Sequence, residues 1–218
     1  SIGLSGDGPA NVFTFSSDYA SDNVVFAGTT TGGFYKSTDN GATFTQKITG
    51  LDRKNITAIS TSNDFRVDRT VFAGGGQGGV FKTSDAGGSW VEVGSGINTG
   101  RAEAIDFSND YSNDSTIFVA TQAGIFRSSD KGTTWTRILF NAPLEPALSL
   151  AVSSNYSNDG HVLIGLKDSG YYRTFVGAGN SWVTQNLGLD TPITNAPNVL
   201  ALSPNFGTDL TAFVGGPG

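Results

Sequence analysis

Three short turns carry the pattern that decides the fold: STDNGATF at residues 37–44, TSDAGGSW at 83–90 and SSDKGTTW at 128–135. They share the form [S/T]-x-D-x-G-x-[S/T]-[F/W]. The aspartate can accept hydrogen bonds from backbone N–H groups just after it, and the glycine two positions later adopts a positive φ without steric cost. We therefore predict three tight hairpins, each followed by an aromatic residue that buries a large surface beside the next unit. The defining residues are Ser37, Asp39, Gly41, Thr43 and Phe44; Thr83, Asp85, Gly87, Ser89 and Trp90; and Ser128, Asp130, Gly132, Thr134 and Trp135.

The turns belong to a repeat that runs through the chain. Five similar apolar segments lie 46, 46, 45 and 50 residues apart, with equivalent residues Phe26, Phe72, Phe118, Leu163 and Phe213. In the first unit we expect four short strands, near residues 12–16, 24–29, 33–37 and 43–48, because apolar and β-branched runs there are bounded by Gly, Asn, Asp and Ser. A fourth copy of the turn, at residues 175–182, keeps Trp182 but lacks the aspartate.

A repeat of about 46 residues with four strands has the size of a β-propeller blade. Inner strands such as 24–27 and 117–120 are apolar throughout, as expected where neighbouring sheets cover both faces. We predict an all-β fold: a β-propeller of four-stranded antiparallel blades, with about five blades represented. The expected units are approximately 5–51, 52–98, 99–142, 143–190 and 191–218.

The last unit leaves two alternatives open. It is incomplete, or an N-terminal strand at residues 1–4 closes it, so that residues 1–218 form a single propeller. Otherwise the chain is part of a larger propeller, and its open strand edges need a partner.

The turn pattern resembles the Asp-box, or bacterial neuraminidase repeat, which is found in sialidases, xyloglucanases, sortilin-type receptors and photosystem II assembly factors. The resemblance covers essentially the whole chain and implies the same propeller fold. It also implies that the box is structural and lies on the outer part of each blade, away from the central pocket.

Composition excludes several classes of protein. The chain has no cysteine, which excludes disulfides, thiol catalysis and cysteine-ligated metals. It carries 13 basic and 19 acidic residues and a net charge of −6, which argues against binding to nucleic acid. No apolar run approaches the roughly 20 residues of a membrane-spanning helix, so membrane insertion is not expected.

Two further sets of polar residues recur. The loops at 18–22, 64–68, 110–114, 155–159 and 205–209 each contain an aromatic residue and end in aspartate. They could hold calcium, but we favour Asx turns with the aromatic residue packed beneath the loop. Cations end the third strands, at Lys36, Lys82, Arg127 and Arg173. They could form a ring for an acidic glycan; we favour pairing with each turn's own aspartate, such as Lys36 with Asp39.

No catalytic constellation is recognisable. The arginines and the glutamates Glu92, Glu103 and Glu145 do not form a sialidase pattern, and His161 is a lone histidine. Asp52, Asp106 and Asp190 could each be proposed as a catalytic carboxylate, but the sequence does not distinguish them from turn-forming residues. The glycine-rich stretch 74–79 is expected to be a hairpin and not a phosphate loop. We predict no catalytic, cofactor-binding or metal-ligating residues, with calcium as an open alternative.

The sequence therefore favours a non-catalytic binding or structural module of a secreted or cell-surface protein, and the resemblance implies a bacterial origin. Its partner would be a protein or glycan ligand, further copies of the chain, or the remaining blades of a longer chain. The alternative is a fragment of a sialidase-like or xyloglucanase-like glycoside hydrolase whose catalytic residues are not recognisable here.

Overall fold

The computed structural model describes residues 8–97, 100–138, 145–167, 170–174, 182–184 and 199–215. Its strands form four antiparallel sheets of four strands and one sheet of two. Within each sheet the strands are neighbours in chain order, so every connection is a hairpin or a short loop.

The first sheet contains β1 (Ala10–Phe15), β2 (Val25–Thr29), β3 (Phe34–Ser37) and β4 (Thr45–Gln46). The second contains β5 (Ile56–Thr61), β6 (Val71–Gly75), β7 (Val80–Thr83) and β8 (Val91–Glu92). The third contains β9 (Ala102–Phe107), β10 (Ile117–Thr121), β11 (Gly124–Ser128) and β12 (Thr136–Ile138). The fourth contains β13 (Ala147–Val152), β14 (Val162–Leu166), β15 (Gly170–Thr174) and β16 (Trp182–Thr184), and the last contains β17 (Val199–Leu202) and β18 (Ala212–Gly215).

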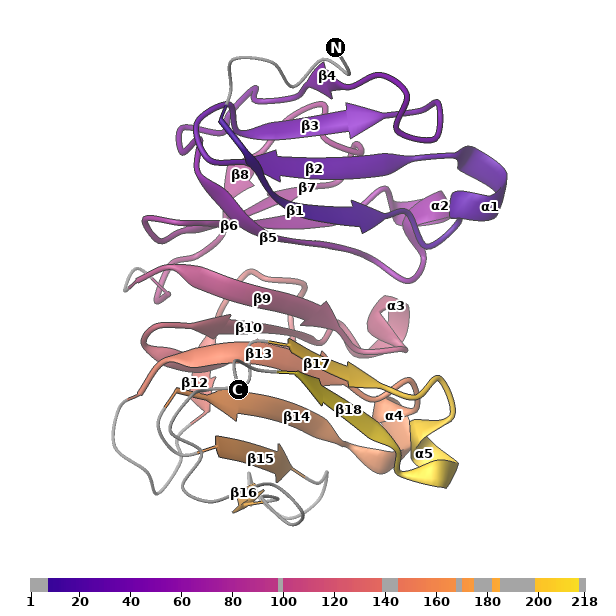
Figure 1. The fold of residues 1–218 in the computed structure, drawn as a ribbon, viewed down its shortest axis with the longest axis vertical. Helices are drawn as coiled ribbons and strands as arrows, with labels where there is room; N and C mark the ends of the chain where they lie inside the picture. The colour runs from indigo at the N-terminus through magenta and orange to yellow at the C-terminus, as the bar shows by residue number, and fades with distance from the viewer. Residues whose placement is uncertain are drawn as a thin grey trace.

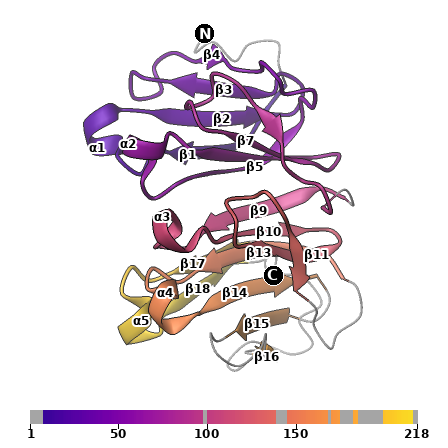
Figure 2. The ribbon, with the colours of Figure 1, turned by 180° about the vertical axis from the view of Figure 1, so that it is seen from behind.

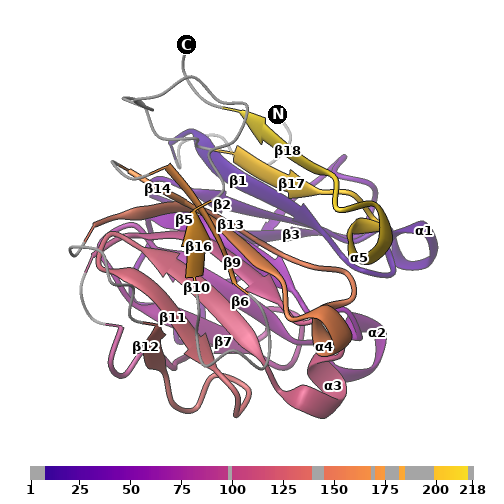
Figure 3. The ribbon, with the colours of Figure 1, turned by 90° about the horizontal axis from the view of Figure 1, so that it is seen from below.

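The first strands of the sheets lie together in the middle of the molecule. In Figure 1 the first sheet extends from them toward the top and the fourth toward the bottom, and the view from behind shows β7 and β11 in front (Figure 2). Each first strand contacts the first strand of the next sheet, from β1 through β5, β9 and β13 to β17. Seen from below, the sheets fan out around these inner strands (Figure 3). The predicted all-β propeller, with about five blades represented, is confirmed.

Side-chain hydrogen bonds link the inner strands of adjacent sheets, whereas within one sheet the strands are linked by backbone hydrogen bonds. The Thr57 hydroxyl donates to the carbonyl of Ala102, at 2.6 Å, and so links the second sheet to the third. The Asp106 carboxylate accepts the backbone N–H of Val152, at 2.8 Å, and links the third sheet to the fourth. These contacts fix the offset of one sheet against the next and satisfy polar groups at the edges of the inner strands.

Burial is deepest in the second strand of each four-stranded sheet, where every residue of β2, β6, β10 and β14 is buried. In the second, third and fourth sheets this follows because a neighbouring sheet lies on each face. The end sheets differ: Phe13 and Phe15 on β1 are 52% and 55% exposed, and Phe213 on β18 is 63% exposed. Among the described residues, large apolar side chains are therefore exposed on the first strand of the first sheet and on the last sheet. Closure of the ring through residues 1–4, one of the two alternatives left open, lies outside the described residues.

Five single-turn helices connect the first and second strands of the sheets. All lie on the same side of the molecule (Figure 1). They are α1 (Tyr19–Asp22), α2 (Phe65–Asp68), α3 (Tyr111–Asp114), α4 (Tyr156–Asp159) and α5 (Phe206–Asp209). Each ends at a residue in the left-handed conformation, for example Asn23 with φ of +56°. None of the helices in the described part of the chain is long enough to cross a bilayer.

Candidate functional site

The three aspartate turns are closed by hydrogen bonds within each turn. In the second copy the Thr83 hydroxyl donates to Asp85 Oδ1 at 2.6 Å, and the Gly87 N–H donates to that hydroxyl at 3.0 Å. Asp85 also accepts the N–H and the hydroxyl of Ser89, at 2.9 and 2.8 Å. The corresponding residues of the other two turns make the same four bonds: Ser37, Asp39, Gly41 and Thr43, and Ser128, Asp130, Gly132 and Thr134.

These bonds leave the carboxylates ionised to low pH. The pKa of Asp85 is lowered to about 2, chiefly by the bond from the Thr83 hydroxyl. The pKa values of Asp39 and Asp130 are also lowered to about 2 by hydroxyl and N–H donors of their own turns. Gly87 has a φ of +92°, as predicted for the glycine of the pattern, and Ala86 before it is also left-handed, with a φ of +59°.

The aromatic residue after each turn faces the preceding sheet, so the predicted contact with the next unit is wrong. Trp90 packs edge-on against Phe34 of the first sheet, with ring centroids 4.5 Å apart, and its indole N–H donates to the Lys47 carbonyl at 3.0 Å. Side chains alternate along a strand, so Trp90 and the following Val91 point to opposite faces. Phe44 of the first sheet has no such partner sheet among the described residues and is only half-buried. The Trp182 side chain lies outside the described residues.

Three of the cations that end the third strands, Lys36, Lys82 and Arg127, do not pair with the aspartates of their own turns. Within the described residues the ion pairs do not include Lys36 with Asp39. Lys36 Nζ lies over the ring of Phe26, 5.9 Å from its centroid, because its side chain lies on the face of the sheet while Asp39 bonds within its own turn. Lys82 takes the equivalent place over Phe72, at 5.7 Å. The predicted Lys36–Asp39 pairing is therefore wrong.

Arg127 has different surroundings, beside Tyr156. Burial raises the pKa of that phenol, and Arg127 acts in the opposite direction. The side chain of Arg173 lies outside the described residues.

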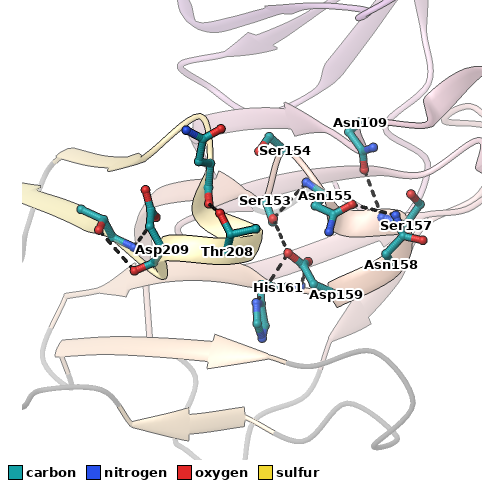
Figure 4. A network of polar contacts seen from close by, with 12 residues as sticks. Asn109, Ser153, Ser154, Asn155, Ser157, Asn158, Asp159, His161, Thr208 and Asp209 are labelled. Carbon is teal, nitrogen blue, oxygen red and sulfur yellow. Dashed lines mark hydrogen bonds and ion pairs between the residues drawn. The ribbon is translucent and has the colours of Figure 1, made fainter.

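The recurring loops hold a bond that the sequence reasoning missed. In the fourth unit the Ser153 hydroxyl donates to Asp159 Oδ2 at 2.6 Å and accepts the Asn155 N–H at 3.1 Å (Figure 4). Asp159 Oδ1 accepts the N–H of His161 at 2.9 Å, which is the predicted Asx turn. The same serine precedes all five loops, at Ser16, Ser62, Ser108, Ser153 and Ser203. Its recurrence six residues before the final aspartate was the signal that could have revealed it.

The loop oxygens are already used within each loop. In the second unit Asp68 accepts the Ser62 hydroxyl at 2.7 Å and the Thr70 N–H at 2.8 Å. Within the described ranges no three His, Cys, Asp or Glu side chains come together as a metal cluster. His161 is buried beside Asp159 and packs edge-on against Phe206, with centroids 5.6 Å apart. Its surroundings are those of a packing residue between the fourth and fifth units.

Polar contacts also run from one loop to the next. Asn109 Oδ1 accepts the Ser157 N–H at 3.0 Å, and the Ser154 hydroxyl donates to the Pro204 carbonyl at 2.6 Å. Figure 4 shows how the first of these bonds joins the third loop to the fourth. The loops thus form one connected rim on the side of the molecule that carries the short helices.

A cavity of about 400 Å³ opens at this rim, where the inner strands of the third, fourth and fifth sheets end. Its polar lining includes Asn63, Asp106, Asn109, Ser153 and Ser154, and leucines of β13 and β17 complete it. Asp106 Oδ2 accepts the Val152 N–H at 2.8 Å and Oδ1 accepts the Phe107 N–H at 2.9 Å. Burial nevertheless raises the pKa of this carboxyl to about 6, against the effect of the two N–H groups.

The structure thus separates the three aspartates that the sequence left equivalent. Asp106 lines the cavity, Asp52 is exposed and Asp190 lies outside the described residues. The residues in register with Asp106 in the other units are Thr14, Ser60, Ala151 and Ala201. An acidic residue at this register was the signal for the site.

The cavity can bind but contains few groups for catalysis. Asp106 is the single titratable side chain among its described lining residues; Glu92, Glu103 and Glu145 do not line it. An ionised carboxylate can accept hydrogen bonds from hydroxyl groups, and the side-chain amides of Asn63 and Asn109 can both donate and accept hydrogen bonds. Hydrolysis of a glycosidic bond by the usual mechanism needs a second carboxylate, roughly 5 to 9.5 Å from the first.

Comparison with known proteins supports the fold. No protein-family model matches the chain, and no curated protein does. An ancestral GH74 enzyme of known structure is similar over 94% of the chain and 27% of its own, with a TM-score of 0.74 and 22% identity. The GH74 xyloglucanase from Xanthomonas campestris is similar over 98% of the chain and 34% of its own, with a TM-score of 0.68 and 18% identity.

A third neighbour is an extracellular domain assigned to a hybrid two component system of B. thetaiotaomicron. The similarity covers 95% of the present chain and 25% of the neighbour's chain, with a TM-score of 0.68 and 13% identity. The chain therefore spans between a quarter and about a third of the length of these proteins. Likeness at these identities establishes the class, a β-propeller. It leaves substrate and activity to the chemistry of the site.

Proposed function

We propose that this chain is an Asp-box β-propeller segment of a secreted or cell-surface protein, and that it binds a carbohydrate without cleaving it. The observation that carries the proposal is the cavity at the inner strands, where one carboxylate, Asp106, stands among amide and hydroxyl groups. The three aspartate turns lie on the β3–β4, β7–β8 and β11–β12 hairpins, away from this cavity, and we assign them a structural role.

A sugar is the ligand class that this lining fits best. Its hydroxyl groups can donate to a carboxylate and exchange bonds with amides, while the apolar face of the ring can lie against Leu150, Leu200 or Leu202. A volume of about 400 Å³ is in the range of small-molecule pockets. Similarity to a xyloglucanase makes oligosaccharides of xyloglucan the first probes.

The test is to measure, by calorimetry, the affinity of xyloglucan oligosaccharides for the unaltered chain and for Asp106→Asn. We expect Asn to weaken binding about ten-fold or more, because hydrogen bonds to a charged group contribute roughly 1.5 to 3 kcal/mol. Asp52→Asn makes the same carboxylate-to-amide change at an exposed residue and should leave the affinity unchanged. Equal affinity for all three proteins would contradict the assignment.

A glycoside hydrolase segment is the second candidate, and the pKa of Asp106 favours it. A carboxyl with a pKa of about 6 is protonated enough near neutrality to act as a general acid. The other carboxylate would then come from residues outside the described part of the chain. Release of reducing ends from xyloglucan, lost in Asp106→Asn, would replace the binding-module proposal with this one.

Apolar residues exposed on the end sheets support a role in a larger assembly. Phe13 and Phe15 lie on the first strand of the first sheet and Phe213 on the last sheet, and each is more than half exposed. We assign them as contact surfaces for further blades, in the same chain or in another copy. Light scattering that shows a larger size at higher concentration would support copies as the partner.

A further inference from the structure

One position in the outer strands is apolar in some sheets and charged in another. The backbone N–H of Lys47 donates to the carbonyl of Phe34, and the N–H of Val93 donates to the equivalent carbonyl of Val80, each at 2.8 Å. Ile138 pairs with Ile125 at the equivalent place in the third sheet. The position is therefore apolar in two sheets, and in the first sheet a half-buried lysine takes it.

A second lysine lies on the same face. Lys36 is in register with Thr45 on the neighbouring strand, two residues from Lys47. Burial lowers the pKa of the Lys36 ammonium, and the charges of Arg69 and Lys47 lower it further, while Asp22 and Asp85 act in the opposite direction more weakly.

The equivalent lysine of the second sheet has a partner that Lys36 does not have. Lys82 Nζ donates to the Lys131 carbonyl at 2.9 Å. Within the described residues, neither Lys36 nor Lys47 donates a side-chain hydrogen bond or has a carboxylate within 4.0 Å. Two half-buried lysines on one face of the sheet, with no carboxylate in contact, are unfavourable, because burial weakens solvation while like charges repel.

These lysines line a cavity of about 220 Å³ with Thr38, Thr43 and Thr45. The Thr43 hydroxyl is bonded to Asp39 at 2.6 Å. The hydroxyls of Thr38 and Thr45 make no hydrogen bond to any described residue and remain available as donors. We call this site the lysine–threonine cavity. It lies on the outermost hairpin of the first sheet, whereas the Asp106 cavity lies at the inner strands.

We propose that the lysine–threonine cavity binds a tetrahedral oxyanion, a sulfate or phosphate group. Lys36 and Lys47 supply the positive charge, and Thr38 and Thr45 donate hydroxyl bonds to further oxygens. A tetrahedral anion offers oxygens in several directions to such separated donors, whereas a planar carboxylate is matched by the fork of an arginine. The source is an inorganic ion or an ester on a glycan, which share this chemistry.

The test is a titration of the ¹⁵N-labelled chain with sodium sulfate and with sodium phosphate at constant ionic strength, followed by NMR. We expect saturable shifts of the amides of Thr38 and Thr45. Lys47→Val places in the first sheet the residue that the second sheet carries, so it should fold, and we expect about ten-fold weaker binding from loss of one short-range charge pair. Lys54→Gln, at an exposed lysine, is the control and should bind as the unaltered chain does.

Two results would overturn the proposal: shifts that fail to saturate in the unaltered chain, or equal affinity in Lys47→Val. Acetate binding more tightly than sulfate would overturn the choice of a tetrahedral anion. Parallel titrations with glucose 6-sulfate and glucose distinguish the sources, because an ester ligand predicts tighter binding of the sulfated sugar than of free sulfate. The readout is independent of Asp106, so failure here leaves the carbohydrate proposal untouched.

Discussion

The sheets in the middle of the chain and those at its two ends share an apolar pattern but bury it to different extents. Phe72 is fully buried, whereas Phe213, at the same place in the repeat, is 63% exposed. Trp90 is 4% exposed, whereas Phe44, which also follows an aspartate turn, is half-buried. The strand pattern specifies which side chains can form a core, and the neighbouring sheet determines whether they do.

This difference indicates that contacts between neighbouring sheets contribute much of the stability of the molecule. Each hairpin is completed by contacts from its neighbour, such as the Trp90 indole on the Lys47 carbonyl and the Phe65 ring 5.6 Å from Phe26. On the end sheets some of the equivalent side chains, such as Phe213, lack these contacts. Repeat proteins in general derive stability from such nearest-neighbour interfaces.

The strongest test of the comparison replaces the aromatic residue after the turn. We expect Trp90→Ala to lower the free energy of unfolding by about 3 to 5 kcal/mol, the usual range for removing a large buried aromatic. Phe44→Ala should lower it by only about 1 kcal/mol, because its ring is partly in water. Urea unfolding followed by circular dichroism, with tryptophan fluorescence as a second probe, measures both.

Equal losses for the two variants would contradict the comparison, since they would mean that the neighbouring sheet adds nothing. Trp90→Phe is the matched control. It keeps most of the packing against Phe34 and loses the indole bond to Lys47, so it should fall between the unaltered chain and Trp90→Ala.

A smaller effect is expected from the serine that holds each helical turn. Ser62 is fully buried, and its hydroxyl bonds both Asp68 and the Asp64 N–H. Ser62→Ala leaves these groups without that partner and should lower stability by about 1 to 2 kcal/mol. Ser203→Ala removes the same bonds in the exposed last unit, where water replaces them, and should change stability by about 0.5 kcal/mol or less. A larger loss for Ser203→Ala, measured by urea unfolding, would reverse the comparison.

Much of the fold could be predicted because the repeat is local. The apolar segments around Phe26, Phe72 and Phe118 and the turns ahead of Trp90 and Trp135 are each readable within one unit. The face to which Trp90 points, and the exposure of Phe213, depend on how one sheet packs on the next. A single strand pattern does not contain that information.

The candidate sites were harder to predict, because each is a departure from the repeat. Within its own unit Asp106 is not distinguishable from a turn-forming residue, whereas its register with Ser60 and Ala151 places it on an inner strand. Lys47 was not singled out, because only the pairing of the outer strands aligns it with Val93 and Ile138. Comparing units position by position, rather than motif by motif, would have found both.

The smallest expected effect is on the pH dependence of unfolding, and it should be the same in an end sheet and in an inner sheet. The pKa values of Asp39 and Asp85 are lowered from 3.8 to about 2, although one turn lies in an end sheet and the other in an inner sheet. A carboxyl whose pKa is lowered by folding stabilises the protein above about pH 3.8, and that contribution is lost as the pH falls toward 2. Asp39→Asn and Asp85→Asn should therefore each make unfolding less dependent on pH in this window, and by equal amounts, because every bond to the two carboxylates comes from their own turns. Urea unfolding at a series of pH values between 2 and 5 measures the slopes. A steeper change for Asp85→Asn would mean that the neighbouring sheet acts on the turn as well as on its aromatic residue, and the division between local turns and shared cores would fail.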